Sequence, residues 1–314
     1  MTTIPTFLVV GAARCGTTGL VEGLRSHPRV FVTDPKEPHY FALHRIGAHF
    51  TAPGDEHTIN KVAVTDRDAY LALYPQEHDF LALGDGSVST IYYHQESIPE
   101  IKAINPDMRL VVMLREPVER AYSSHQYMTA RGLEPVADFL EAVGLEEQRI
   151  ADGWHHIWHY TAQSRYADQV GAFLDAFPAE QVGVFFYDDL NRDYEGTVSR
   201  ILRFLDVPPA PGEGEGVPRV NVSGQPRFAL AHRAIAWATG HARLRQWVKD
   251  HTSYRLRERV RRSILRQDTV SAQARAALTP LFADDLRRLA EMLEGRLETE
   301  APAWLTEAGR GAAR

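Results

Sequence analysis

The chain has 314 residues, of which 44% are hydrophobic and 24% are charged, the usage of a globular protein with an ample core. This composition excludes a disordered, collagen-like or disulfide-stapled chain. The formal charge of −6 argues against a protein that coats nucleic acid or another polyanion. The single cysteine, Cys15, excludes an intramolecular disulfide and a multi-cysteine zinc site, and it fits a reducing compartment.

The beginning of the chain carries no targeting or membrane signal. The first apolar run, 7–10, is far too short to cross a bilayer, and no basic stretch precedes it. We therefore expect a cytoplasmic protein without a transmembrane segment, with a single domain over residues 1–308 and a frayed tail over 309–314. The stretch 208–218, rich in Gly, Pro and Glu, is expected to be a surface loop within that domain.

Buried strands and helices alternate along the chain. Continuous apolar runs bounded by turn residues predict strands at 7–10, 29–32, 80–83, 109–114 and 182–186. Apolar residues at helical spacing predict helices from Thr18 and within 139–145, 166–177 and 276–293. The stretch 42–79 has no long period and suits an insertion of short helices. Such alternation predicts a three-layer α/β fold, a central, mainly parallel sheet flanked by helices, with ligand loops at the carboxyl ends of the strands.

The strongest chemical signal is Gly11-Ala12-Ala13-Arg14-Cys15-Gly16-Thr17-Thr18, which lies between the first predicted strand and a helix. Glycines let the backbone wrap an anion, and the loop amides together with the helix start attract a phosphate group. The spacing from Gly11 to Gly16 is that of a Walker A loop, but Thr17 stands where such loops place their lysine. The cation is Arg14 instead, so the loop favours a 5′-phosphate without a triphosphate tail.

This loop resembles the 5′-phosphosulfate-binding loop of the sulfotransferases that use PAPS (3′-phosphoadenosine 5′-phosphosulfate), whose usual form is close to G-x-P-K-S-G-T-T. The resemblance implies a P-loop-type fold, which agrees with the predicted elements. Arg14 stands where the family most often has lysine. Its guanidinium group is wider than an ammonium and stabilises negative charge, but it cannot act as an acid. By resemblance, PAPS is bound by Gly11, Ala13, Arg14, Cys15, Gly16, Thr17 and Thr18.

A second segment of the same family follows the strand predicted at 109–114. Arg115-Glu116-Pro117-Val118-Glu119-Arg120-Ala121-Tyr122-Ser123 resembles the 3′-phosphate motif R-x-P-x-x-R-x-x-S. PAPS carries a 3′-phosphate that ATP lacks, and an arginine fork with a hydroxyl at a helix start supplies matching donors. The resemblance implies that Arg115 and Ser123 bind this phosphate.

A third segment, Lys36-Glu37-Pro38-His39-Tyr40-Phe41, is similar to the K-E-x-x-F-F-like segment of the heparan-sulfate and bacterial carbohydrate sulfotransferase branch. The resemblance implies that Glu37 is the general base. This role requires a carboxylate near the acceptor, whose pKa is raised by burial or held by a neighbouring cation. His39 either orients Glu37, shares its proton or only packs. Lys36 either neutralises sulfuryl or bridging oxygens or faces solvent.

Weaker resemblances extend the site. Gly84-Asp85-Gly86-Ser87-Val88-Ser89 resembles the family's G-E-x-S-P-S segment. Gly86 stands where the heparan-modifying enzymes carry a second active-site lysine, which argues against a heparan-like acceptor. The segment 220–227 has the position of a loop that folds over the cofactor, and it brings Arg227 toward the 3′-phosphate or the adenine. The residues expected to line the acceptor site are His39, Ser87, Ser89 and Tyr92.

Two further features have more than one interpretation. Residues 219–266 contain twelve Lys or Arg against two acids, a charge of +10, while the rest of the chain carries −16. This basic stretch contacts an anion, a membrane surface, a partner or only water. His155 and His159 have a spacing that suits a metal on a helix, but no third ligand is evident, so a substrate wall or a packing patch is preferred.

Together these segments predict an enzyme of the EC 2.8.2 type, which transfers a sulfuryl group from PAPS to a hydroxyl, or less readily an amine, of a small-molecule or carbohydrate-like acceptor. PAP is the product, and no metal is required because the cations are side chains. Two rival functions stay open. A P-loop nucleotide kinase would carry the Walker lysine that position 17 lacks, and a non-catalytic adapter would keep PAP as a ligand. Neither the acceptor nor the oligomeric state follows from the sequence.

Overall fold

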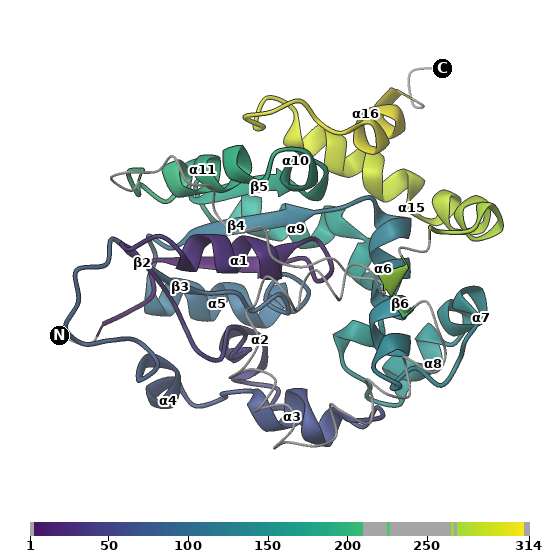
Figure 1. The fold of residues 1–314 in the computed structure, drawn as a ribbon, viewed down its shortest axis with the longest axis horizontal. Helices are drawn as coiled ribbons and strands as arrows, with labels where there is room; N and C mark the ends of the chain where they lie inside the picture. The colour runs from purple at the N-terminus through teal and green to yellow at the C-terminus, as the bar shows by residue number, and fades with distance from the viewer. Residues whose placement is uncertain (1–2, 210–224, 227–264, 267–268, 311–314) are drawn as a thin grey trace.

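A computed structural model describes residues 3–209, 225–226, 265–266 and 269–310 of the chain (Figure 1). Its main sheet has five parallel strands in the order β2-β3-β1-β4-β5. These are β1 (Phe7–Gly11), β2 (Val30–Val32), β3 (Ala82–Asp85), β4 (Arg109–Leu114) and β5 (Val182–Phe186). The five predicted strands and the parallel α/β class are therefore confirmed. A separate antiparallel pair joins β6 (Gln225–Pro226) and β7 (Leu265–Arg266).

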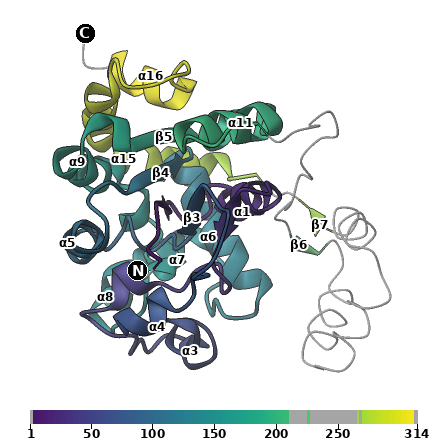
Figure 2. The same cartoon turned by 90° about the vertical axis from the view of Figure 1, so that its left-hand side faces the viewer.

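Helices cover both faces of the main sheet. In Figure 2, α1 and α11 lie on one side of the strands, and α5 and α9 lie on the other. Because both faces are covered, β1 and β4 are buried along almost their whole length and consist of continuous apolar runs. The longer helices among the described residues, together with the short helix α10 that follows β5, are α1 (Thr17–Arg25), α5 (His94–Ile104), α6 (Pro117–Ala130), α9 (Tyr166–Ala176), α10 (Tyr187–Arg192), α11 (Tyr194–Phe204), α15 (Ala272–Leu293) and α16 (Ala303–Arg310).

Strand β3 differs from its prediction at both ends. The apolar run 80–83 suggested a strand that stops before Gly84, but β3 begins at Ala82 and continues to Asp85. Gly84 pairs with Phe7 of β1, and a Cβ at this position would lie 2.2 Å from the carbonyl oxygen of Phe7. The glycine therefore stays inside the ladder because two backbones approach closely there, and not because the chain turns.

The segments between the long elements hold short helices. The stretch 42–79 behaves as expected, and the helix expected within 139–145 is observed as α7 (Phe139–Gly144), which a second short helix follows from Glu146. Asp138 begins the first of these by accepting a hydrogen bond of 2.9 Å from the amide of Glu141. The short helices are α2 (Tyr40–Leu43), α3 (Ile59–Val62), α4 (Arg67–Leu71), α7 (Phe139–Gly144), α8 (Glu146–Ala151), η1 (Asp55–His57), η2 (His156–Trp158), η3 (Ala162–Ser164) and η4 (Ala179–Gln181).

The C-terminal helices pack over α9. Asp285 of α15 accepts hydrogen bonds from the amides of Tyr166 (2.8 Å) and Ala167 (3.1 Å), which open α9 without a side-chain cap of their own. Helix α16 runs to Arg310, so the tail predicted from residue 309 begins inside a helix. Within the described ranges, no helix is long and apolar enough to span a bilayer.

Candidate active site

The two motifs predicted to bind phosphate, the loop 11–16 (the phosphate loop) and the 3′-phosphate motif 115–123, follow neighbouring strands at the centre of the sheet. The loop 11–16 leaves the carboxyl end of β1, and Arg115 follows the carboxyl end of β4. The chain proceeds from β1 to the edge strand β2, whereas from β4 it proceeds to the opposite edge, β5. In open α/β sheets, ligands bind in the crevice that such a reversal of direction creates. The sheet order therefore places both motifs where a ligand is expected.

The structure brings the predicted 5′ and 3′ residues together. An Nη of Arg115 donates to the carbonyl oxygen of Arg14 at 3.4 Å, and Nε of Arg14 donates to Oγ of Ser123 at 3.4 Å. The ring of Tyr187, the first residue after β5, lies 4.6 Å from the Arg115 guanidinium. The same ring borders Gly16, where a Cβ would lie 2.9 Å from it. The two motifs thus form one cluster, and Tyr187 is a member that the sequence did not reveal.

The loop has a backbone shape that few residues permit. Three of its residues have left-handed φ angles, Gly11 (149°), Arg14 (70°) and Gly16 (81°). The chain then enters α1, with Thr17 buried and Thr18 exposed on the first turn. The first amides of a helix have no partner within it, so this turn offers backbone donors to an anion. Cys15 is fully buried, and burial raises the pKa of its thiol to about 11, which keeps it protonated.

Arg120, the second arginine of the 3′-phosphate motif, has an unexpected place. Its side chain is fully buried, and burial lowers its pKa. In the part of the chain that the structure describes, its hydrogen bonds reach neutral oxygens, namely Oγ of Ser164 (2.5 Å), the carbonyls of Tyr160 (2.5 Å) and Ala13 (3.5 Å), and the side chain of Gln163 (3.4 Å). A buried cation of this kind is costly without a compensating negative charge. An anion in the adjoining loop would supply that charge.

Cations predominate around Arg14. Burial lowers the pKa of Arg14 to about 10; neighbouring arginines add to this change, and the ionisable phenol group of Tyr127 opposes it. Those neighbours are Arg115, Arg120 and Arg131. Nε of Arg115 is buried and has no hydrogen-bond partner among the described residues, although one Nη pairs with Glu119 at 3.3 Å. Among the described residues, several arginines and the unpaired N–H donor of Arg115 suit a phosphate or sulfate group.

The predicted general base forms an ion pair with its neighbour in sequence. Nζ of Lys36 lies 2.5 Å from Oε1 of Glu37, whose side chain is 29% exposed. Burial raises the pKa of Glu37, but Lys36 and His39 outweigh it and hold that pKa below its ordinary value. Arg14 acts on the carboxylate in the same direction, which places Glu37 within electrostatic reach of the phosphate loop. Glu37 is therefore ionised at neutral pH and can accept a proton.

Gly86 makes room for the side chain of Lys36. The amide of Gly86 donates to the carbonyl of Lys36 at 2.9 Å. A Cβ on Gly86 would lie 2.8 Å from Cγ2 of Val21 and 3.0 Å from Cε of Lys36. The methylenes of Lys36 thus lie over the glycine, and a second lysine at position 86 has no space unless Lys36 moves.

His39 is fixed by the two serines that were expected to line the acceptor site. Its amide donates to Oγ of Ser87 at 3.0 Å, and its Nδ1 shares a hydrogen bond of 2.8 Å with Oγ of Ser89. Both serines are fully buried, so their hydroxyls serve His39 rather than an open surface. Asp85 anchors the same turn by accepting hydrogen bonds from the Ser87 amide (2.8 Å) and the Tyr70 hydroxyl (2.7 Å). Burial lowers the pKa of His39 to about 4, so the ring is neutral at pH 7.

A group of rings, which we call the ring cluster, connects His39 with Tyr92. The cluster consists of His39, Tyr92, Tyr93, His156 and His159. Centroids of His39 and His156 lie 6.2 Å apart, those of Tyr93 and His156 lie 5.5 Å apart, and Tyr92 shares a hydrogen bond of 2.8 Å with His159. The spacing of His155 and His159 suits one face of a helix, but only the short turn η2 lies between them, and His155 pairs with Asp55 at 3.2 Å. No group of three metal-ligating side chains occurs among the described residues.

Two predicted features lie outside this cluster of motifs. Arg227 is outside the described residues, as is most of the basic stretch 219–266.

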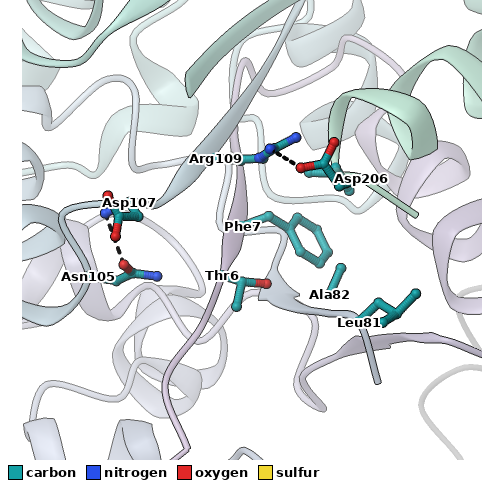
Figure 3. Close-up of a pocket in the computed structure, with 9 residues that line it drawn as sticks. Thr6, Phe7, Leu81, Ala82, Asn105, Asp107, Arg109 and Asp206 are labelled. Carbon is teal, nitrogen blue, oxygen red and sulfur yellow. Dashed lines mark hydrogen bonds and ion pairs between the residues drawn. The ribbon is translucent and has the colours of Figure 1, made fainter. Parts of the chain in front are cut away.

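A cavity of about 480 Å³ lies at the amino ends of β1, β3 and β4, the opposite edge of the sheet (Figure 3). Its lining includes Phe7 and the ion pair of Arg109 with Asp206, and it contains no residue of the phosphate motifs. This cavity is therefore not part of the candidate active site.

Comparisons with known proteins agree with the motifs. Residues 5–211 match the family model described as "Sulfotransferase family". Carbohydrate sulfotransferase 15 of Mus musculus is 27% identical over 249 residues, covering 66% of this chain and 44% of that protein. The human bifunctional heparan sulfate N-deacetylase/N-sulfotransferase 3 is 23% identical over 221 residues, covering 66% of this chain and 23% of that protein. The chain thus matches less than half the length of these curated relatives.

One solved structure is similar over nearly the whole chain. The crystal structure of a sulfotransferase from Alicyclobacillus acidocaldarius is 27% identical, with a TM-score of 0.72. The match covers 96% of this chain and 99% of that one. The similarity of fold therefore extends over nearly the whole chain.

Proposed function

We infer the function from one premise, that the chain belongs to the sulfotransferase family, as the motifs and the family match agree. We propose that it transfers a sulfuryl group from PAPS to a hydroxyl, less readily an amine, of a small-molecule or carbohydrate-like acceptor. Glu37 is the general base of this proposal. The observation that supports it most is the contact between the two phosphate motifs, Arg115 to Arg14 and Arg14 to Ser123.

The residues of the cluster fit a nucleotide with phosphates on both the 5′ and the 3′ side of its ribose. The unpaired Nε of Arg115 offers a donor, and Ser123 adds a hydroxyl for the 3′-phosphate. The loop 11–16, with Arg14, Thr17 and Thr18, would hold the 5′ end. Arg227 is proposed to approach the same nucleotide. A kinase would need the lysine that position 17 lacks.

PAPS supplies the sulfuryl group, whose bond to the 5′-phosphate oxygen breaks as the acceptor oxygen bonds to sulfur. Glu37 takes the proton of the acceptor hydroxyl during this displacement. Arg14 and the loop amides stabilise the charge that develops on the departing phosphate oxygen. Lys36 has two roles in this scheme, since its ammonium keeps Glu37 ionised and would neutralise the sulfuryl oxygens.

The relatives support a carbohydrate-like acceptor, because those described above are named as carbohydrate and heparan sulfate sulfotransferases. Within the ring cluster, Tyr92 and Tyr93 are only half-buried, and a sugar ring could pack on them. Gly86 stands where the heparan-modifying enzymes carry a second lysine, and the side chain of Lys36 covers this position. We therefore favour a smaller or less anionic acceptor than heparan.

The direct test uses PAPS labelled with ³⁵S, the purified protein and metabolite extracts of the source organism. The proposal expects a labelled product whose mass exceeds that of an extract component by one sulfuryl group, together with release of PAP. An adapter would bind PAP and transfer no label to any component. A kinase would gain thermal stability from ATP with Mg²⁺ and not from PAP. That result would contradict the proposal.

A further inference from the structure

Tyr127 lies on the face of α6 that meets the phosphate loop. It follows Ser123 by four residues and precedes Arg131 by four, so the three side chains lie on one side of the helix. The guanidinium of Arg14 lies 4.3 Å from the centroid of the Tyr127 ring, while its Nε reaches Ser123 at 3.4 Å. Tyr127 therefore holds the far end of Arg14, although it lies one turn beyond the 3′-phosphate motif.

The near end of Arg14 is fixed by the loop itself. Its backbone has a φ of 70°, a left-handed conformation that limits where its side chain can point. Its carbonyl accepts a hydrogen bond from Arg115 at 3.4 Å, and the neighbouring Cys15 amide donates to the carbonyl of Ala12 at 3.3 Å. With its base held by the loop and its tip held by a ring, the guanidinium lies at the junction of the two phosphate motifs.

The charges around Arg14 explain why an aromatic ring suits this place. Burial and three nearby arginines lower the pKa of Arg14 to about 10, and Tyr127 acts in the opposite direction. The ring presents the negative face of its π system, which attracts a cation. Arg131 lies 4.4 Å from the same ring and shares this attraction. A carboxylate would neutralise the charge of a guanidinium, whereas a ring stabilises the cation without neutralising it.

We propose that Tyr127 is a positioning residue, which holds the charged Arg14 between the sites for the two nucleotide phosphates. This inference rests on the proposed function, because it assigns the anion near Arg14 to that nucleotide. It also gives a reason for arginine in a loop where the family most often has lysine. A planar guanidinium stacks on a ring over its whole surface, whereas an ammonium is a compact point charge. Arg14 and Tyr127 therefore act as one unit.

The test is calorimetric titration of the full chain with PAP. Removing the ring in Tyr127→Leu is expected to weaken PAP binding about tenfold, and Arg14→Lys by a similar factor, from the usual strength of a desolvated cation–π contact. Tyr127→Phe keeps the ring and is expected to bind within about twofold of the wild type. The double variant Arg14→Lys/Tyr127→Leu is expected to bind about as well as either single variant, because both changes break the same contact.

Phe177→Leu is the matched control, because this ring makes a cation–π contact of its own with Lys102 at 5.2 Å and belongs to neither motif. It is expected to keep PAP affinity, and melting temperatures of all variants report folding. Where leucine at 127 prevents folding, Tyr127→Met replaces it with the same expectation. Wild-type affinity in the ring-less variant, multiplied effects in the double variant, or equal losses with Phe and Leu would each overturn the inference. A wild type that does not bind PAP contradicts the proposed function instead.

Discussion

The nucleotide side and the acceptor side of the candidate site are built differently. On the nucleotide side, backbone amides and arginines supply donors that stay charged or polar across the physiological pH range. On the acceptor side, Glu37 and His39 are titratable groups whose protonation depends on burial and on each other. The charge of the proposed nucleotide side is fixed, whereas the protonation of the proposed acceptor side is adjusted by its neighbours. Substitutions on the two sides should therefore have separable effects.

The largest effect is expected from Glu37→Gln, which removes the proposed base and keeps the shape of the side chain. Transfer to the acceptor found by labelling should fall by about 10² or more, the usual contribution of a general base. PAP affinity should stay nearly unchanged, because Glu37 belongs to the acceptor side. Steady-state kinetics and PAP titration measure the two quantities separately. Comparable turnover in this variant would remove Glu37 from the role.

Arg115→Ala should have the converse effect. Losing charge-assisted hydrogen bonds to a phosphate is expected to weaken PAP binding by about 10- to 100-fold. The acceptor KM should change little, because Arg115 contacts the phosphate loop and not the ring cluster. A titration in which this variant binds PAP as the wild type does would contradict the assignment.

Gly86→Ala is expected to act on the acceptor side through Lys36. The added Cβ would lie 3.0 Å from Cε of Lys36 and 2.8 Å from Val21, so the lysine stem must shift. We expect a loss of transfer of about tenfold, an order of magnitude for a small misplacement of catalytic groups. Gly144→Ala is the control, since a Cβ there has no neighbour within 4 Å among the described residues. Equal rates in the two variants would show that Lys36 need not be held in place.

A smaller effect is expected on the pH dependence of the free energy of unfolding, through His39. The pKa of His39 is lowered to about 4, below its ordinary value, so the unfolded chain binds more protons as pH falls below about 6.5. The contribution of a neutral, buried His39 to the free energy of unfolding is complete above that pH. It decreases as pH falls toward 4, and the loss reaches about 2 kcal/mol at pH 5. Urea unfolding at pH 7.5 and pH 5 should therefore show less acid destabilisation in His39→Gln. An unchanged pH dependence would contradict the burial of a neutral ring.

The same contrast decides what the sequence could predict. The nucleotide side consists of short segments at strand ends, so the loop 11–16 and Arg115 could be recognised from order and spacing alone. The positions of Tyr187 and Arg120 in the site depend on contacts with residues that are distant in sequence, so residue spacing does not predict them. On the acceptor side, Glu37 was identified by resemblance, but the buried serines beneath His39 were expected to face the acceptor.

Element boundaries follow the same logic. Strand β4 was predicted to the residue because its apolar run is continuous and its end is marked by the polar turn after Leu114. Strand β3 was misplaced because Gly84 signals a turn by local chemistry, whereas its contact with Phe7 is seventy-seven residues away in sequence. The spacing of His155 and His159 suggested one helical face, yet a short 3-10 turn separates them.

The central claim is that two motifs together bind a nucleotide with phosphates at both the 5′ and the 3′ position. Its most direct test is calorimetric comparison of PAP with AMP, which lacks the 3′-phosphate, on the wild-type chain and on Arg115→Ala. The account predicts that PAP binds the wild type at least about tenfold more tightly than AMP, and that Arg115→Ala loses most of this difference. Equal affinities of the wild type for PAP and AMP would contradict it.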